Sequence, residues 1–335
     1  MNCKRYDILV PINHKFALYG FSNISANIPP QTELSPNFYV LNANPFELDD
    51  HWKKWLGEIQ SEKIEDCNFV ILATMASEKT HELDEENKHL SHLVNRYFNL
   101  LCLFGTPLYD KGVQITGAHS EDGFEIRQTY SPLRFYRNRH SKPFWISETY
   151  LVKTYEFLQK FLSISSGPSE EKPPLIRRGY ACRLGALLEW TLEERLHQFV
   201  RSIEALLNLK VGQGYQVFAE RAQLFIKKTG ESKNLLEQIY KIRGRVEHLQ
   251  TFDDLFAGAE GDVLTSFARK SAQVEIISGY IYRKIFEQAD LLEIFSDDAS
   301  ISRFWECSEE ERVPKWGQPL DLELSTKEIF MTDGV

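Results

Sequence analysis

Four segments with helical periodicity follow one another in the C-terminal half of the chain, and this succession restricts the possible folds most. They cover roughly residues 179–208, 213–229, 231–250 and 262–290, and the breaks between them are short and contain glycine. Short connections favour antiparallel packing of consecutive helices. We therefore predict an all-α bundle over residues 179–295.

The first half of the chain combines strand and helix patterns. Short apolar or alternating runs predict strands at residues 68–75, 113–116, 124–129 and 133–136, whereas residues 16–28 are typical of irregular strand or loop. Aspartates 49 and 50 precede a short helix, and apolar residues at helical spacing predict a long amphipathic helix over residues 83–104 and a further helix over 146–164. No phosphate-binding loop or glycine-rich nucleotide fingerprint is present. These patterns predict an α+β domain over residues 1–165, with a role in sensing or recruitment.

Two further segments complete the predicted organisation. Residues 166–178 begin with a polar, proline-rich run that cannot bury apolar surface, which indicates a linker. Residues 291–335 carry 11 acidic and 4 basic side chains. Tryptophans 305 and 316 and Phe330 lie among these acids, so we expect residues 296–335 to pack as an irregular acidic extension.

Composition narrows the class of protein further. The 335 residues are 42% hydrophobic and 26% charged, as in ordinary globular proteins. No apolar run approaches the ~18 residues that span a bilayer, and no export signal is visible, so we expect a cytoplasmic protein without a membrane partner. The net charge of −9 argues against coating nucleic acid through bulk charge, but it leaves room for a local phosphate site. No metal or other cofactor is expected, because the histidines near residue 89 do not follow the His-Glu-x-x-His order.

One helical segment separates its apolar and polar residues clearly. On a helical wheel of residues 235–249 the apolar side chains fall within a sector of roughly 80° and should face the core: Leu235, Ile239, Ile242, Val246 and Leu249. Tyr240, Arg243, Glu247 and His248 share the opposite, exposed side.

This polar face allows two interpretations. Arg243 and Glu247 form an i,i+4 pair and His248 lies in the last turn, where a cation suits the helix dipole, so the face could simply be solvated. Alternatively, the guanidinium binds a phosphate while the imidazole moves a proton near neutral pH. Those two groups suffice for RNA cleavage, in which the ribose 2′-hydroxyl is an internal nucleophile.

Arg243 and His248 are badly placed to act together on one phosphate from a single helix. Five residues correspond to about 7.5 Å of rise and about 140° of rotation. Two copies facing each other across a symmetry axis would bring the side chains together. Gly244, on the same face, would let two backbones approach closely at such an axis.

The segment from Tyr240 to His248 resembles the Tyr-x-x-Arg-x(4)-His signature of HEPN domains, especially the Apea-like branch. The sequence from Phe199 to Leu207, which contains Glu204-Ala205-Leu206-Leu207, is similar to a phrase on an early helix of that branch. The resemblance covers about residues 180–290. It implies that the C-terminal bundle is HEPN-like.

The resemblance also implies a function. Family members of this type are homodimeric, metal-independent endoribonucleases, many of them growth-arresting toxins or phage-defence effectors, and an antitoxin or regulatory protein is a further possible partner. By this resemblance Arg243 binds the scissile phosphate and His248 is the acid or base, with Tyr240 and Glu247 beside them. Active members often have a polar residue after the arginine, where this chain has Gly244. The alternative is a HEPN module that dimerises and binds a nucleic acid, nucleotide or protein without catalysis.

Basic residues elsewhere could contact RNA. Arg134, Arg137 and Arg139 alternate with Phe135 and Tyr136 in a pattern that suits single-stranded nucleic acid. The same pattern also fits a strand with core aromatics and arginines paired to nearby acids. Arg245, beside the signature histidine, is another candidate for RNA binding.

Overall fold

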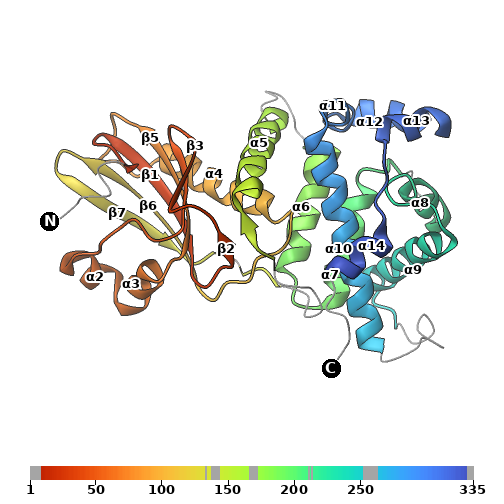
Figure 1. Cartoon of the computed structure of the whole chain (residues 1–335), viewed down its shortest axis with the longest axis horizontal. Helices are drawn as coiled ribbons and strands as arrows, with labels where there is room; N and C mark the ends of the chain where they lie inside the picture. The colour runs from red at the N-terminus through yellow and green to blue at the C-terminus, as the bar shows by residue number, and fades with distance from the viewer. Residues whose placement is uncertain are drawn as a thin grey trace. The chain divides into compact units, whose positions relative to one another are not determined.

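The computed structural model describes residues 9–132, 134–136, 144–165, 173–209, 212, 214–251 and 263–329. The chain divides into two compact units. The first, here called the sheet unit, consists of residues 1–133 and 143–159; the second, the helical unit, consists of residues 134–142 and 160–335 (Figure 1). The predicted succession of an α+β part and an all-helical part is confirmed at this level.

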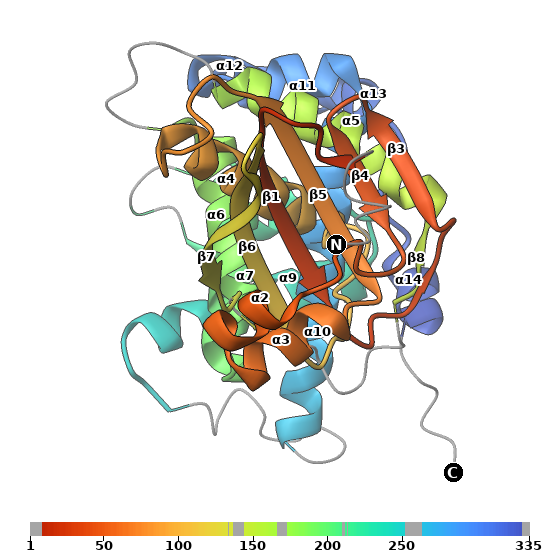
Figure 2. The same cartoon turned by 90° about the vertical axis from the view of Figure 1, so that its left-hand side faces the viewer.

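The sheet unit is built on a six-stranded antiparallel sheet of order β3-β4-β5-β1-β6-β7 (Figure 2). Its strands are β1 (His14–Phe21), β3 (Gln31–Ser35), β4 (Phe38–Leu41), β5 (Phe69–Ala76), β6 (Gly112–Ser120) and β7 (Gly123–Tyr130). Two short strands, β2 (Ala26–Asn27) and β8 (Ile146–Ser147), form a separate parallel pair. The hairpin of β6 and β7 and strand β5 agree with the predicted strands.

The prediction of irregular structure from residue 16 was wrong, because β1 is a central strand. It pairs with β5 on one side, from His14 opposite Ala76 to Phe21 opposite Phe69, and with β6 on the other. All its residues except His14 are buried. Polar and aromatic residues such as Lys15 and Tyr19 obscure the alternation in the sequence, but both lie in a central strand that is covered on both faces.

Helices cover both faces of this sheet. On one face Phe16 and Leu18 join a core with Ile64 of α3 (Glu58–Glu65), and Trp52 of α2 (Asp50–Leu56) packs against it. On the other face, Phe21 stacks on Phe98 of α4 (Glu85–Leu101) with ring centroids 4.1 Å apart. Asp49 accepts a hydrogen bond from the Trp52 amide, so the predicted aspartate cap of the short helix is confirmed. The predicted long amphipathic helix is α4.

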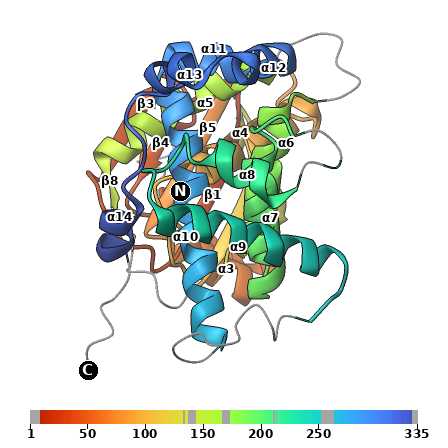
Figure 3. The same cartoon turned by 90° about the vertical axis from the view of Figure 1, so that its right-hand side faces the viewer.

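The helical unit contains nine helices in the described part of the chain, after the last turn of α5 (Glu148–Ser165). They are α6 (Leu175–Leu188), α7 (Leu192–Glu204), α8 (Tyr215–Ala222), α9 (Gly230–Glu247), α10 (Val263–Glu287), α11 (Ala289–Phe295), α12 (Asp298–Glu306), α13 (Glu309–Trp316) and α14 (Leu322–Ile329). Helix α7 packs against α6, α9 and α10, and α8 packs against α9 (Figure 3).

Close contacts hold α6, α7 and α10 together. The Tyr282 hydroxyl donates to the Ser202 carbonyl at 3.0 Å, and the hydroxyls of Ser202 and Ser278 are 2.7 Å apart. A β-carbon at Gly179 would lie 2.2 Å from the Tyr282 hydroxyl oxygen, so only glycine fits at this point of α6. The central position of α7 places its C-terminal residue, Glu204, beside α9.

Two predictions for secondary structure were wrong. The predicted helix over residues 179–208 is two helices, α6 and α7, because Glu189 and Thr191 are extended and end the first before the second begins. Residues 134–136 form no strand: the Tyr136 amide donates to the Leu187 carbonyl, and this segment belongs to the helical unit.

The acidic C-terminal extension is helical where it was expected to be irregular. Its tryptophans are buried, Trp305 on α12 and Trp316 at the end of α13. The acids serve as caps and surface residues: Asp297 caps α12, and Glu311 completes a capping box with Ser308. Phe330 lies outside the described residues, as do residues 166–172 of the predicted linker, while Leu175 to Arg178 form the first turn of α6. No helix in the described ranges is both long and apolar enough to cross a membrane.

Candidate functional site

Helix α9 carries the polar face predicted from the sequence. It begins at a capping box, in which Thr229 accepts from the Ser232 amide and the Ser232 hydroxyl accepts from the Thr229 amide. Its buried side is formed by Leu236, Ile239, Ile242 and Val246. The helix ends at Glu247, and the His248 amide donates to the Gly244 carbonyl at 3.1 Å.

Two residues of the predicted core stripe of α9 are not fully buried. Leu249 is 93% exposed and has a positive φ of 53°, because the chain leaves the helix at His248 and turns. Leu236 is fully buried, whereas Leu235, which was assigned to the stripe, is only half-buried. The wheel assumed a continuous helix to residue 249, and the projection fails where the helix stops.

Arg243 is the centre of a cluster of charged and aromatic side chains. Its Nη2 lies 3.1 Å from Oε2 of Glu204 on α7, and its Nη1 donates to Oε2 of Glu247 one turn further along α9. The guanidinium carbon lies 5.6 Å from the centre of the Tyr240 ring, within cation–π distance. The Arg243 side chain is 18% exposed and that of Glu204 is 23% exposed. The cluster is therefore at the surface but largely shielded from water.

Tyr240 joins the same cluster from the side of α8. Its hydroxyl is 3.3 Å from Oε1 of Glu204, and its ring packs on Phe218 of α8 with centroids 4.7 Å apart. Burial raises the pKa of the Tyr240 phenol, and the Glu204 carboxylate raises it further. The phenol therefore stays protonated at neutral pH and donates to Glu204. Both oxygens of that carboxylate are thus used, one by Tyr240 and one by Arg243.

His248 and Gly244 lie on the open part of this face. The His248 side chain is exposed, and its imidazole has no hydrogen-bond partner within the described ranges. A β-carbon at Gly244 would meet nothing within 4 Å, so the space above the helix at this point is open. The imidazole is free to contact another molecule, whereas the guanidinium is already paired.

Of the other predicted RNA-binding residues, Arg134 and Arg245 lie in the described part of the chain. The Arg245 guanidinium donates to the Thr251 carbonyl at 2.7 Å, just past the end of α9. Arg134 is exposed in an irregular segment. Arg137 and Arg139 lie outside the described residues. No described residues form a group of three or more His, Cys, Asp or Glu side chains that could hold a metal ion.

Glu204 is the functional candidate to which sequence reasoning assigned no role. It was quoted only as part of the segment from Phe199 to Leu207, and its contacts with Tyr240 and Arg243 lie 36 and 39 residues away in sequence. The only sequence feature that pointed to Glu204 was its charge at the end of an amphipathic helix. The sequence does not predict which residues Glu204 contacts, because the packing of α7 against α9 determines them.

Comparison with known proteins adds no family assignment: no family model, curated protein or solved structure matches the chain.

Proposed function

We propose that this protein is an endoribonuclease of the HEPN type, which cuts RNA through attack of the ribose 2′-hydroxyl at a site shared by two copies of the chain. The observation that carries the proposal is the contact of Glu204 with both Tyr240 and Arg243. It connects the two segments, on α7 and α9, whose sequences resemble that family. A growth-arresting or phage-defence role is part of the proposal.

In the proposed reaction each side chain has a separate task. Arg243 binds a non-bridging oxygen of the scissile phosphate, because a guanidinium offers two parallel donors to an oxyanion. The 2′-hydroxyl attacks phosphorus, its proton passes to a base, and the 5′-oxygen leaves with a proton. The products are a 2′,3′-cyclic phosphate and a 5′-hydroxyl. His248 takes or supplies one of these protons. No cofactor is invoked.

The charge balance of the cluster sets a condition for this reaction. Arg243 is paired with two carboxylates of its own chain, and their negative charges repel a phosphate, so we expect at least one of them to leave when a phosphate binds. Glu247 is the one to leave, since its side chain is 44% exposed and rehydrates easily, whereas Glu204 is also held by Tyr240. Glu204 then keeps one Nη group oriented while the other binds phosphate.

The shared site follows from the separation of the two groups on the helix. His248 follows the last turn of α9 and lies about 7.5 Å further along the axis than Arg243. The exposed imidazole and the open space above Gly244 leave room for a second copy of α9. In such a dimer, Arg243 of one copy acts with His248 of the other.

The test is cleavage of single-stranded RNA in the presence of EDTA. We expect the parent protein to cut, and both Arg243→Ala and His248→Ala to lose at least about 100-fold in rate. Lys241→Ala, which removes a neighbouring charge from the same helix, serves as the matched control and should retain activity. End-group analysis should find the cyclic phosphate on the 5′ fragment.

A mixture of the two inactive variants tests the shared site. If Arg243 and His248 come from different chains, mixed dimers of Arg243→Ala and His248→Ala contain one intact pair and regain part of the activity. Restoration on mixing supports the dimeric arrangement, whereas an inactive mixture of dimers shown to exchange subunits contradicts it.

A second candidate function is a non-catalytic module that dimerises or binds a partner. The observation favouring it is that Arg243 is paired with two carboxylates from its own chain. Gly244 also stands where active relatives often have a polar side chain. Equal background cleavage by the parent protein and both alanine variants supports this module over the nuclease.

A further inference from the structure

The turn that follows Glu204 is held by side chains from two other helices. Helix α7 ends at Glu204, and residues 205–208 turn away from it. The carbonyl groups at the end of a helix lack intrahelical partners and need donors. The Trp305 indole of α12 donates to the Leu206 carbonyl at 2.8 Å, and Arg221 of α8 donates to the carbonyls of Leu207 and Asn208 at 2.6 and 2.9 Å.

A third contact fixes the last residue of this turn. Asn208 has a positive φ of 49°, and its side-chain amide donates to the Ser302 hydroxyl of α12 at 3.2 Å. Leu206, Leu207 and Asn208 are therefore each bonded to side chains that lie 13 to 99 residues further along the chain. The position of the end of α7 depends on α8 and α12.

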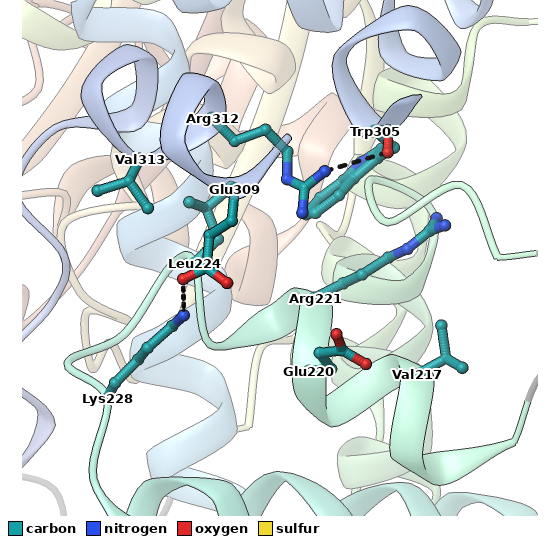
Figure 4. Close-up of a pocket in the computed structure, with 9 residues that line it drawn as sticks. All are labelled: Val217, Glu220, Arg221, Leu224, Lys228, Trp305, Glu309, Arg312 and Val313. Carbon is teal, nitrogen blue, oxygen red and sulfur yellow. Dashed lines mark hydrogen bonds and ion pairs between the residues drawn. The ribbon is translucent and has the colours of Figure 1, made fainter. Parts of the chain in front are cut away.

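Trp305 is itself held between two arginines. The guanidinium carbons of Arg221 and Arg312 each lie 5.3 Å from the indole, and Arg312 of α13 also donates to the Trp305 carbonyl at 3.2 Å. Figure 4 shows the Trp305 side chain between these two arginines. They line a pocket of about 220 Å³, across which Lys228 pairs with Glu309. Helices α8, α12 and α13 are thus joined beside the end of α7.

We propose that Trp305, Arg221 and Arg312 form a clamp that positions Glu204 and, through it, orients the guanidinium of Arg243. The clamp can act in this way because the hydrogen bonds of Glu204 tolerate only small displacements. Glu204 touches Arg243 at 3.1 Å and Tyr240 at 3.3 Å, and a hydrogen bond is lost when its partners move apart by a fraction of an ångström. A shift of the turn at residues 206–208 is transmitted directly to Glu204, because it is the last residue of the helix before that turn.

Through the clamp, the positions of α12 and α13 determine whether Glu204 can bind Arg243. Any binding event or modification that displaces these helices releases Glu204 and lets Arg243 rotate. The effect on RNA cleavage rests on the function proposed above, whereas the effect on the Arg243 guanidinium does not. The two are measured separately for that reason.

The first experiment removes one hydrogen bond of the clamp and compares it with a matched tryptophan. Trp305→Phe keeps an aromatic ring between the arginines but loses the donor to Leu206. Trp316→Phe is the control, since Trp316 is fully buried in the same unit and its indole nitrogen has no partner in the described part of the chain. Arg221→Lys, on a different helix, shortens the side chain by one atom and so weakens the bonds to Leu207 and Asn208. Circular dichroism confirms that each variant is folded.

The readout is the rotation of the Arg243 guanidinium in the full chain at neutral pH, measured by ¹⁵N NMR and assigned with Arg243→Lys. In the parent protein the two Nη groups bind two carboxylates, which slows rotation. Loss of the Glu204 contact in Trp305→Phe or Arg221→Lys should speed rotation by about tenfold, as expected for one hydrogen bond. Glu204→Ala, which removes both acceptor oxygens, provides the reference for full release, and Trp316→Phe should match the parent protein.

Equal rotation rates in the parent protein, Trp305→Phe and Arg221→Lys would overturn the clamp. So would the same acceleration in Trp316→Phe, because the effect would then report general loosening of the unit. In the cleavage assay we expect Trp305→Phe to lose about tenfold while Trp316→Phe stays within about twofold. A parent protein that does not cut RNA refutes the proposed function, and the NMR comparison still decides the clamp.

Discussion

Each of the two units contains a largely buried cation that is bound by two carboxylates, and the clusters around these two cations differ in their access to water. In the sheet unit, Lys15 is fully buried, with its Nζ 2.7 Å from Asp84 and 3.0 Å from Glu86. In the helical unit, Arg243 keeps 18% of its side chain exposed between Glu204 and Glu247. The clusters of Lys15 and Arg243 thus carry the same charges, the first in a closed setting and the second in a partly open one.

The additional bonds of the carboxylates reinforce this difference. Asp84 caps α4 by accepting from the Glu86 amide, and Glu86 accepts from the Ser77 hydroxyl at 2.6 Å. These bonds hold both acids in place around Lys15. In the other cluster Glu204 is also bound by Tyr240, but Glu247 is an exposed surface residue. A closed cluster stabilises a fold, whereas a partly open one can exchange a carboxylate for another anion.

Truncating each cation should give the largest contrast between the two clusters. Lys15→Ala removes a buried side chain and its contacts, so we expect a loss of about 2–5 kcal/mol in unfolding free energy. Arg243→Ala breaks a surface cluster and should cost about 1 kcal/mol or less. Urea denaturation followed by circular dichroism measures both. Equal losses in the two variants would mean that burial does not separate the clusters.

Acid should weaken the sheet unit through the same lysine. Hydrogen bonds and the charge of Lys15 hold the pKa values of Asp84 and Glu86 below their usual values, with the Lys15 bond as the largest cause for Asp84 and the Ser77 bond for Glu86. A carboxyl with a lowered folded-state pKa stabilises the fold above its unfolded pKa of about 4, and this contribution is lost as pH falls through the folded value.

Comparing the parent protein with Lys15→Met isolates the contribution of Lys15 to the pH dependence of stability. The difference in unfolding free energy between the parent protein and the variant should be greatest near neutral pH and shrink as pH falls below about 4. Urea denaturation at a series of pH values gives the difference directly. A difference that stays constant down to pH 2 would show that Lys15 does not stabilise the ionised acids.

Removing the exchangeable carboxylate should strengthen anion binding in the open cluster. Glu247→Gln frees one Nη group of Arg243, and we expect RNA to bind about two- to fivefold more tightly, the size of one exposed ion pair. Fluorescence anisotropy in the His248→Ala background measures binding without cleavage. The matched variant Glu204→Gln should not tighten binding equally, since it releases the orientation of the guanidinium; equal gains in both would refute the separate roles.

The smallest predicted effect concerns Gly244. Gly244→Ala should raise the unfolding free energy by about 0.5–1 kcal/mol, because alanine favours the helix and its β-carbon meets nothing within 4 Å. If this face contacts a second chain, the same methyl group weakens the dimer. Sedimentation velocity compared with urea denaturation separates the two effects. A variant that is less stable as a monomer would show that the space above Gly244 is occupied.

Local patterns predicted the elements that depend on local chemistry. The amphipathic spacing of Leu90, Val94 and Leu101 indicated α4. The aspartate that precedes Trp52 indicated the start of α2. The polar side of α9 was also predictable, because periodicity alone separates Tyr240 and Arg243 from the buried Ile239 and Ile242. Patterns failed where a helix break or a long-range contact determines the structure. The break between α6 and α7 and the turn at Leu249 are of the first kind, and the acidic extension, which buries two tryptophans, is of the second.

By itself the sequence determined that an α+β region precedes a series of helices, and that one of these helices carries a tyrosine, an arginine and a histidine away from its apolar stripe. Spacing of apolar residues suffices for this, since it reflects which side of each element is buried. The tertiary structure alone decided that Glu204 binds both Tyr240 and Arg243, and that Trp305 and Arg221 hold the turn beside it. Those contacts join residues up to 99 positions apart, and only the packing of helices brings such residues within hydrogen-bond distance.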